Sequence, residues 1–207
     1  QQHTTRRRQR QMCIRDSCRR IEEFDFSGID AVLSASPSYN KPSQKGIIEH
    51  FNKVADTSPK PVILYNVPSR TGSNMAASTT LELSKHKNII AIKEASGNLS
   101  QVDEILRSKS EDFQVFSGDD GLTLAMISSG ADGVISVIGN ALPKRFGSMV
   151  NQALFGQIIE AREMHHKLNP IIEAIFEEGN PTGIKSVMDI IGSVSYTHLT
   201  LPTTCTV

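Results

Sequence analysis

Short apolar runs recur along the chain, separated by segments with helical periodicity. Residues 30–36, 61–66, 88–94, 113–118 and 132–137 have the length and bounded composition of buried strands. After the first run, Ile47, Phe51 and Val54 follow the i, i+4, i+7 spacing of a helix with one apolar face. Strands that alternate with helices predict βαβ units and a parallel sheet. Right-handed crossovers then place the C-terminal ends of all strands on the same side.

Polar residues gather at those C-terminal ends, and this feature separates two architectures. A doubly wound nucleotide-binding sheet should carry a glycine-rich phosphate turn after its first strand, and none is present in the sequence. In a (β/α)₈ barrel the C-terminal ends form the active-site face. About five βα units and then helical patterns from about Pro143 onward predict an α/β fold: a partial (β/α)₈ barrel followed by C-terminal helices.

The composition changes sharply at the two ends of the chain. Residues 1–20 hold seven of the 22 basic residues and one acidic residue, whereas residues 21–192 hold 15 basic and 21 acidic residues. The strings QMCIRDS and VSYTHLTLPTT resemble translated adapter sequence. We therefore expect a foreign or disordered head (1–20), a partial barrel (21–150), a C-terminal helical region (151–192) and a foreign or disordered tail (193–207). The alternative for the head is a nucleic-acid-binding arm.

The sequence disfavours a disulfide, a cysteine metal site, a membrane span and a secretory signal. The three cysteines, Cys13, Cys18 and Cys205, lie outside residues 21–192, so that segment offers no disulfide and no cysteine metal site. There is no apolar run of about 18 residues and no apolar secretory segment, which predicts a cytoplasmic protein. We expect no cofactor.

Two pairs of neighbouring residues could suggest a metal site. His165 and His166 point in different directions if they are helical. For Asp119 and Asp120, a cap on the following helix is the favoured interpretation, because a carboxylate suits a helix N-terminus.

Lys93 ends the third apolar run, and it raises the central chemical question. Because side chains alternate along a strand, Lys93 shares a face with the small Ala91 and would stand in the barrel mouth. Desolvation there lowers the pKa of a lysine, and a neutral amine attacks carbonyl groups to form a Schiff base. The alternative is a strand-end lysine paired with Glu94 or another carboxylate.

The second run ends in a tyrosine and is followed by a loop arginine. The hydroxyl of Tyr65 could relay protons in the barrel mouth, or its ring could simply pack. Arg70, in the sequence PSRTG, could bind a carboxylate in a bidentate manner or could be a solvated loop residue.

The strings SPSYNKPSQKG, ILYNVPSRTG, IAIKEASGN, FSGDD and GADGVISV together resemble the dihydrodipicolinate synthase family of pyruvate-dependent class I aldolases. The resemblance runs from about Phe26 to Gly192. It implies a lyase that condenses pyruvate with L-aspartate 4-semialdehyde in lysine and diaminopimelate biosynthesis. It also implies that Lys93 forms the Schiff base, that Tyr65 relays protons and that Arg70 binds the carboxylate of the aldehyde.

The same resemblance implies roles for three further residues. Tyr39 matches a tyrosine that reaches into the partner subunit's active site, which implies a homo-oligomer, a dimer or a tetramer. Gly118 and Ile135 match positions that line the pyruvate pocket. No cofactor, nucleic acid or membrane is implied.

Two departures from the family qualify this resemblance. No threonine loop of the type G-T-T-G-E occurs, and the match begins near the fourth barrel strand, so we expect a fragment of the enzyme. Ser38 stands where some relatives carry a tyrosine. The alternatives are another pyruvate-dependent lyase, such as one similar to N-acetylneuraminate lyase, and a non-catalytic fragment.

Overall fold

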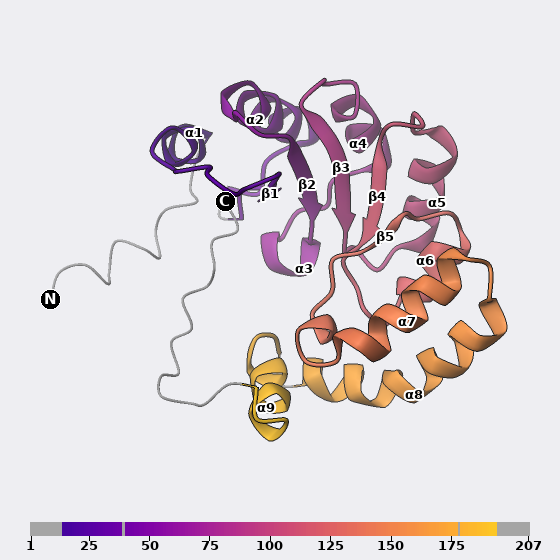
Figure 1. Cartoon of the computed structure of the whole chain (residues 1–207). Helices are drawn as coiled ribbons and strands as arrows, with labels where there is room; N and C mark the ends of the chain where they lie inside the picture. Colours follow the sequence, from indigo (N-terminus) through magenta and orange to yellow (C-terminus); the bar gives the residue numbers. More distant parts are fainter. Residues whose placement is uncertain (1–13, 39, 178, 194–207) are drawn as a thin grey trace, which may run out of the picture. The chain divides into compact units, whose positions relative to one another are not determined.

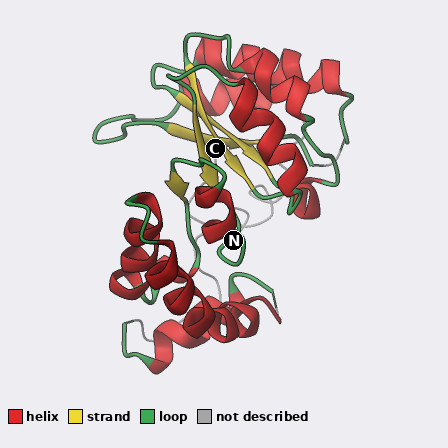
Figure 2. Cartoon of the chain, turned by 90° about the vertical axis from the view of Figure 1, so that its right-hand side faces the viewer, coloured by secondary structure: helices red, strands yellow, loops and turns green. Residues whose placement is uncertain are grey.

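The structure is a computed structural model that describes residues 14–38, 40–177 and 179–193. The chain divides into two compact units, the first reaching Val115 and the second beginning at Phe116, so that the boundary falls inside one strand. Along the chain, strands are followed by helical segments, as expected from the sequence (Figures 1 and 2). The sheet has the strand order β1-β2-β3-β4-β5, and the pairs β1–β2, β2–β3 and β4–β5 are parallel.

The first unit carries the first three βα units. Its elements are α1 (Ile14–Glu22), β1 (Val32–Ala35), α2 (Gln44–Thr57), β2 (Val62–Asn66), α3 (Pro68–Thr71), α4 (Ala77–Leu83), β3 (Ile89–Glu94), α5 (Leu99–Ser108) and the start of β4 (Gln114–Ser117). Helix α2 begins where the Ser43 side chain accepts a hydrogen bond from the Gly46 N–H, and it packs on α4 and β2.

The two faces of β1, β2 and β3 differ in burial. Val32, Val62 and Leu64 lie on the buried face of the first two strands. The opposite face is half-buried in β1 and β2 and becomes buried in β3. Strand pairing arranges this second face in two rows, Leu33–Ile63–Ala91 and Ala35–Tyr65–Lys93. Such rows of side chains fill the interior of a (β/α)₈ barrel, so Tyr65 and Lys93 share the face on which alternation placed Lys93.

Part of the head of the chain, expected to be foreign or disordered, forms a helix. Residues 1–13 lie outside the described residues, but residues 14–20 belong to helix α1, which packs against α2. Cys18 and Ile21 are buried, because both side chains fall on the face of α1 that meets the rest of the unit. A basic, polar helix with one narrow apolar face was missed because its charge dominated the sequence pattern. The proposed division at residue 20 is therefore not a boundary between structured and unstructured chain.

The second unit contains the remaining strand and the helices expected after residue 143. Its elements are the end of β4, α6 (Thr123–Ser128), β5 (Gly133–Val134), the 3₁₀ helix η2 (Ile138–Asn140), α7 (Pro143–Leu154), α8 (Ile158–Glu177) and α9 (Thr182–Ile190). Proline occupies the first turn of α7, where its missing N–H costs nothing. The division expected at residue 150 does not match the two compact units, and α7 and α8 pack directly against each other.

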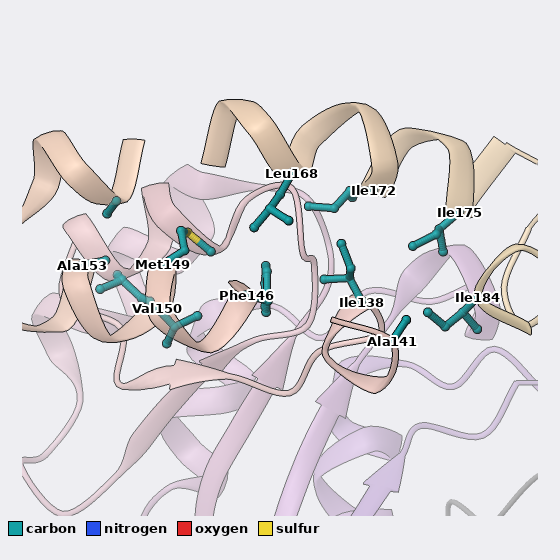
Figure 3. Packing of buried hydrophobic residues seen from close by; sticks show 12 residues of the cluster. Ile138, Ala141, Phe146, Met149, Val150, Ala153, Leu168, Ile172, Ile175 and Ile184 are labelled. Atoms are coloured by element: carbon teal, nitrogen blue, oxygen red, sulfur yellow. The ribbon is translucent and has the colours of Figure 1, made fainter. Parts of the chain in front are cut away.

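The core of the second unit joins η2, α7, α8 and α9. In Figure 3, Leu168 and Ile172 point from α8 toward Phe146 of α7 and Ile138 of η2. Ile138 is fully buried. Because interiors are close-packed, the removal of methyl groups there leaves a cavity that the surrounding helices fill incompletely.

We expect Ile138→Ala to lower the free energy of unfolding of the chain by about 2 to 5 kcal/mol. Ile159, on α8, is 62% exposed, so the same substitution there should change stability by less than about 0.5 kcal/mol. Urea unfolding of both variants measures the difference. Equal losses would contradict the packing described for Ile138.

His50, on α2, gives the first unit a pH dependence. The residue is 2% exposed, and its ring stands edge-on to Phe51, with 5.1 Å between the ring centroids. Nδ1 of His50 has no hydrogen-bond partner among the described residues. Burial disfavours the charged ring and lowers the pKa of His50 from 6.5 to about 4.

The resulting stability should be complete above about pH 6.5 and should be lost as the pH falls toward 4, because the unfolded chain binds the proton first. The loss should reach about 3 kcal/mol at the lower limit. We expect His50→Leu to reduce this dependence in urea unfolding measured from pH 7 to pH 4. The exposed His166 provides the control, and His166→Leu should keep most of the wild-type dependence, because its charge lowers only the pKa of the neighbouring His165. Parallel curves for wild type and His50→Leu would contradict the assignment.

Candidate functional site

Tyr65 and Lys93 lie side by side at the C-terminal ends of two paired strands. They are register partners in β2 and β3, and Nζ of Lys93 lies 4.5 Å from the centroid of the Tyr65 ring. Lys93 is 8% exposed and Ala91, below it on the same face, is fully buried. The small side chain of Ala91 leaves room for the lysine stem to stand on this face. A cation over an aromatic ring is attracted by the negative face of the ring.

Burial and charge act in opposite directions on Tyr65. Partial burial raises the pKa of the Tyr65 phenol above its ordinary value, because the phenolate loses solvation. The positive charge of Arg70 opposes this and lowers the pKa of Tyr65. The neutral phenol is therefore favoured, and it can both donate and accept a proton.

Arg70 lies in a short, tightly turned connection after β2. Helix α3 begins with Pro68 and ends at Thr71, and the following Gly72 adopts a left-handed φ of 71°. A Cβ atom at Gly72 would lie 2.9 Å from Cε of Lys41, so the loop after β1 packs directly on this turn. Glycine is favoured there by its left-handed backbone conformation, whereas the flexible end of the Lys41 side chain could move aside. The Arg70 side chain is exposed.

Behind Lys93, the next residue begins a buried polar network. Glu94 is 1% exposed, and both of its carboxylate oxygens accept hydrogen bonds. Oε1 accepts from the Ser96 N–H at 2.6 Å, and Oε2 accepts from Nδ2 of Asn66 at 2.9 Å and Nε2 of Gln101 at 3.1 Å. Because side chains alternate, the carboxylate lies on the opposite face of β3 from the ammonium group of Lys93.

The network continues into the chain segment that follows Arg70. Oδ1 of Asn66 accepts from the Met75 N–H at 3.0 Å. Oδ1 of Asn74 accepts from Nδ2 of Asn66 at 2.8 Å, and Nδ2 of Asn74 donates to Oε1 of Gln101 at 2.8 Å. Sequence reasoning missed this network. The polar residues directly after Tyr65 and Lys93 were its signal, but their pairing depends on a strand register that the sequence does not state.

Gly118 and Ile135 belong to the second unit. Gly118 directly follows β4, and the Ile135 N–H donates to the Ser117 carbonyl at 2.9 Å, so both lie at the C-terminal ends of paired strands. Oδ1 of Asp119 accepts from the Gly121 N–H at 2.9 Å, inside the turn that precedes α6. The capping interpretation is wrong, because the N-cap of α6 is Leu122 and no side chain caps this helix.

Asp120 instead reaches the connection after β5. Oδ2 of Asp120 accepts from the Val137 N–H at 3.1 Å and from the Ile138 N–H at 2.8 Å. Desolvation raises the pKa of Asp120 above its ordinary value, against the opposing effect of these hydrogen bonds.

Three further expectations concern Tyr39, a metal site and a membrane span. Tyr39 lies outside the described residues, so its position stays a prediction. Within residues 14–38, 40–177 and 179–193, no three His, Cys, Asp or Glu side chains converge as metal ligands. In the same part of the chain, no helix has the length and apolar character needed to cross a membrane.

Comparison with known proteins connects this geometry to one family. A sequence model of the family described as "Dihydrodipicolinate synthetase family" matches residues 13–206. A 4-hydroxy-tetrahydrodipicolinate synthase of Phocaeicola vulgatus is 49% identical over 183 residues, which are 88% of this chain and 62% of that protein. Its counterpart in Flavobacterium psychrophilum is 53% identical over 176 residues, 83% of this chain and 60% of that protein.

Solved structures agree with these relatives. The crystal structure of dihydrodipicolinate synthase from Aquifex aeolicus is 36% identical, with a TM-score of 0.86, and the match covers 93% of this chain and 66% of that one. This likeness confirms the partial (β/α)₈ barrel expected from the sequence. The chain spans less than two thirds of the length of the two curated relatives.

The opposing effects on Tyr65 can be separated by substitution. Arg70→Ala removes the positive charge that favours the phenolate, so we expect the pKa of Tyr65 to rise further above 10.0. The phenolate absorbance of a Tyr39→Phe/Tyr196→Phe chain, which retains Tyr65 as its single tyrosine, measures this pKa. Arg107→Ala, at an exposed position on α5, serves as the control and should leave the pKa unchanged. A fall on removal of Arg70 would contradict the assignment.

Proposed function

The chain belongs to the dihydrodipicolinate synthetase family, and from this membership we propose that it is a lyase that forms a lysine Schiff base. The proposed reaction is that of 4-hydroxy-tetrahydrodipicolinate synthase, the condensation of pyruvate with L-aspartate 4-semialdehyde. The observation that carries the proposal is the buried Lys93 beside Tyr65 at the C-terminal ends of paired parallel strands. An amine in that position can react with a carbonyl compound that enters from the open end of the strands.

Lys93 is the proposed nucleophile. Its neutral amine adds to the ketone carbon of pyruvate, and the resulting carbinolamine loses water to give an iminium ion. Loss of a proton from the pyruvate methyl group gives an enamine, whose carbon forms the new bond to the aldehyde carbon of the second substrate. Tyr65 supplies and removes protons in these steps, and the preference for its neutral form supports the role of donor.

The remaining site residues have proposed binding roles. Arg70 binds the carboxylate of L-aspartate 4-semialdehyde, and its exposed position in the loop after β2 supports contact with an incoming substrate. Gly118 and Ile135 line the pyruvate pocket, and Tyr39 completes a partner subunit's site. The proposal therefore includes a homo-oligomer, a dimer or a tetramer. It also includes a cytoplasmic location and a place in lysine and diaminopimelate biosynthesis.

One observation favours a second candidate, a fragment that does not complete the reaction by itself. The chain spans 62% of its Phocaeicola vulgatus relative, and Leu33 and Ile63 are only half-buried on the face that a barrel encloses. A different pyruvate-dependent lyase, such as one similar to N-acetylneuraminate lyase, is the third candidate. Arg70 favours the first proposal over the third, because a guanidinium group suits a carboxylate-bearing aldehyde.

Borohydride trapping tests the proposal directly. Borohydride reduces an iminium ion to a stable amine, so the purified chain incubated with pyruvate should gain the mass of one reduced pyruvyl group, and peptide mapping should place it on Lys93. Lys93→Ala should abolish the adduct. Lys87, an exposed lysine just before β3, is the matched control, and Lys87→Ala should retain the adduct.

Addition of L-aspartate 4-semialdehyde before borohydride separates the three candidates. Depletion of the adduct in wild type, and much slower depletion in Arg70→Ala, is expected for the proposed reaction. An adduct that the aldehyde does not deplete would support the incomplete fragment. Depletion by a sugar aldehyde alone would support the third candidate. The absence of any Lys93 adduct in wild type would refute the proposed function for this chain.

A further inference from the structure

We propose that Glu94 is a positioning residue of this site. Through its hydrogen bonds to Asn66 and Gln101, Glu94 fixes the position of Lys93 and of the loop that carries Arg70. The inference rests on the proposed function, because it concerns the geometry of the same lysine. Its physical basis is the buried network of amide and carboxylate groups behind the strand ends. None of these groups needs to touch substrate to act.

The carboxylate of Glu94 accepts hydrogen bonds from donors in three different segments of the chain. The Ser96 N–H belongs to the turn after β3, Asn66 ends β2, and Gln101 lies in the first turn of α5. Helix capping also fixes the position of Gln101, because its backbone N–H donates to Oδ1 of Asn98, the N-cap of α5. A fully buried carboxylate that lost one of these donors would keep a desolvated lone pair without a partner.

Each side-chain amide in the network has one orientation that satisfies its partners. Oδ1 of Asn66 accepts from the Met75 N–H, so Nδ2 of Asn66 must face Glu94 and Asn74. Nε2 of Gln101 donates to the Met75 carbonyl at 3.1 Å and to Glu94, while its Oε1 accepts from Asn74. A side chain at position 94 that could not accept these hydrogen bonds would force several side-chain amides to change orientation together.

The network is linked through the backbone to three proposed site residues, Tyr65, Lys93 and Arg70. Asn66 follows Tyr65, Glu94 follows Lys93, and Asn74 lies two residues beyond the Gly72 turn that ends the Arg70 helix. The pairing of Asn66 with Glu94 continues the register that pairs Tyr65 with Lys93. Because consecutive strand residues share one backbone, a shift of Glu94 moves Lys93 relative to the Tyr65 ring.

Glu94→Gln tests this role with little change of size. The substitution replaces one acceptor oxygen by an NH₂ group that faces the N–H donors of the network. Glu104→Gln, at an exposed position on α5, is the matched control. Gln101→Met, similar in length and without hydrogen-bonding groups, is a second variant that removes one donor and leaves the carboxylate in place. Circular dichroism establishes the folded fraction of every variant.

The position of Lys93 can be read without any catalysis. In chain made with lysine carrying ¹³C at Cε, a side chain over the Tyr65 ring should give an NMR signal displaced by the ring current. Lys93→Ala identifies the signal by its loss, and Tyr65→Leu removes its displacement. We expect Glu94→Gln to move this signal most of the way to that of the exposed Lys87, and Gln101→Met to move it less in the same direction. Glu104→Gln should leave it in place.

The same variants should alter the rate of Schiff-base formation. A displacement of about 1 Å costs on the order of 100-fold in rate, so we expect borohydride trapping of pyruvate on folded Glu94→Gln to slow about 100-fold. Variants that are less stable but keep the wild-type Lys93 signal and trapping rate would overturn the inference, because Glu94 would then be merely structural. If Glu94→Gln does not fold, an unmoved signal in folded Gln101→Met overturns it.

The two proposals fail separately. No pyruvate adduct in wild-type chain would end the proposed function, whereas the Lys93 signal in the variants would still decide the role of Glu94. A normal wild-type adduct with unmoved signals would end the inference alone.

Discussion

The parallel pairing of β2 with β3 is the constraint on which the candidate site depends. This single register places Tyr65 beside Lys93 on one face and Asn66 beside Glu94 on the other. The proposed reactive residues and the polar network that supports them therefore lie on opposite faces of the same pair of strands. A slip of one residue would exchange the faces and would bury the polar pair where the reactive pair now stands.

The face of β2 and β3 opposite Tyr65 and Lys93 is held by polar rather than apolar side chains at the strand ends. Apolar side chains pack well in many related arrangements, whereas a buried carboxylate with amide donors is satisfied in few. The free energy needed to bury Glu94 thus selects one geometry for the strand ends. In the second unit, Asp120 holds the connection after β5 through backbone N–H groups in a similar way. Both units place a buried carboxylate beside residues with proposed pocket roles.

The repeating pattern of the sequence was sufficient to predict most of the fold. The five apolar runs became the five strands, because alternation of short strands and amphipathic helices has few compact solutions. The position of Lys93 above Ala91 also followed from alternation alone. The contacts of Asn66 and Glu94 could not be predicted, because they depend on a register between residues 28 positions apart in the sequence. Helix α1 was missed because the apolar side chains of Cys18 and Ile21, which are buried, are a small signal among basic neighbours.

The contact between Lys41 and Gly72 links two connections that are far apart in sequence. Lys41, itself at a positive φ of 40°, lies where any side chain at position 72 would have to be. Cε belongs to the far end of a flexible, exposed side chain, so a Cβ atom at position 72 would displace the Lys41 stem at little steric cost. The constraint at position 72 is therefore the backbone conformation, a left-handed φ of 71° that L side chains rarely adopt. A side chain at position 72 would consequently strain the turn that carries Arg70 even after the Lys41 stem had moved aside.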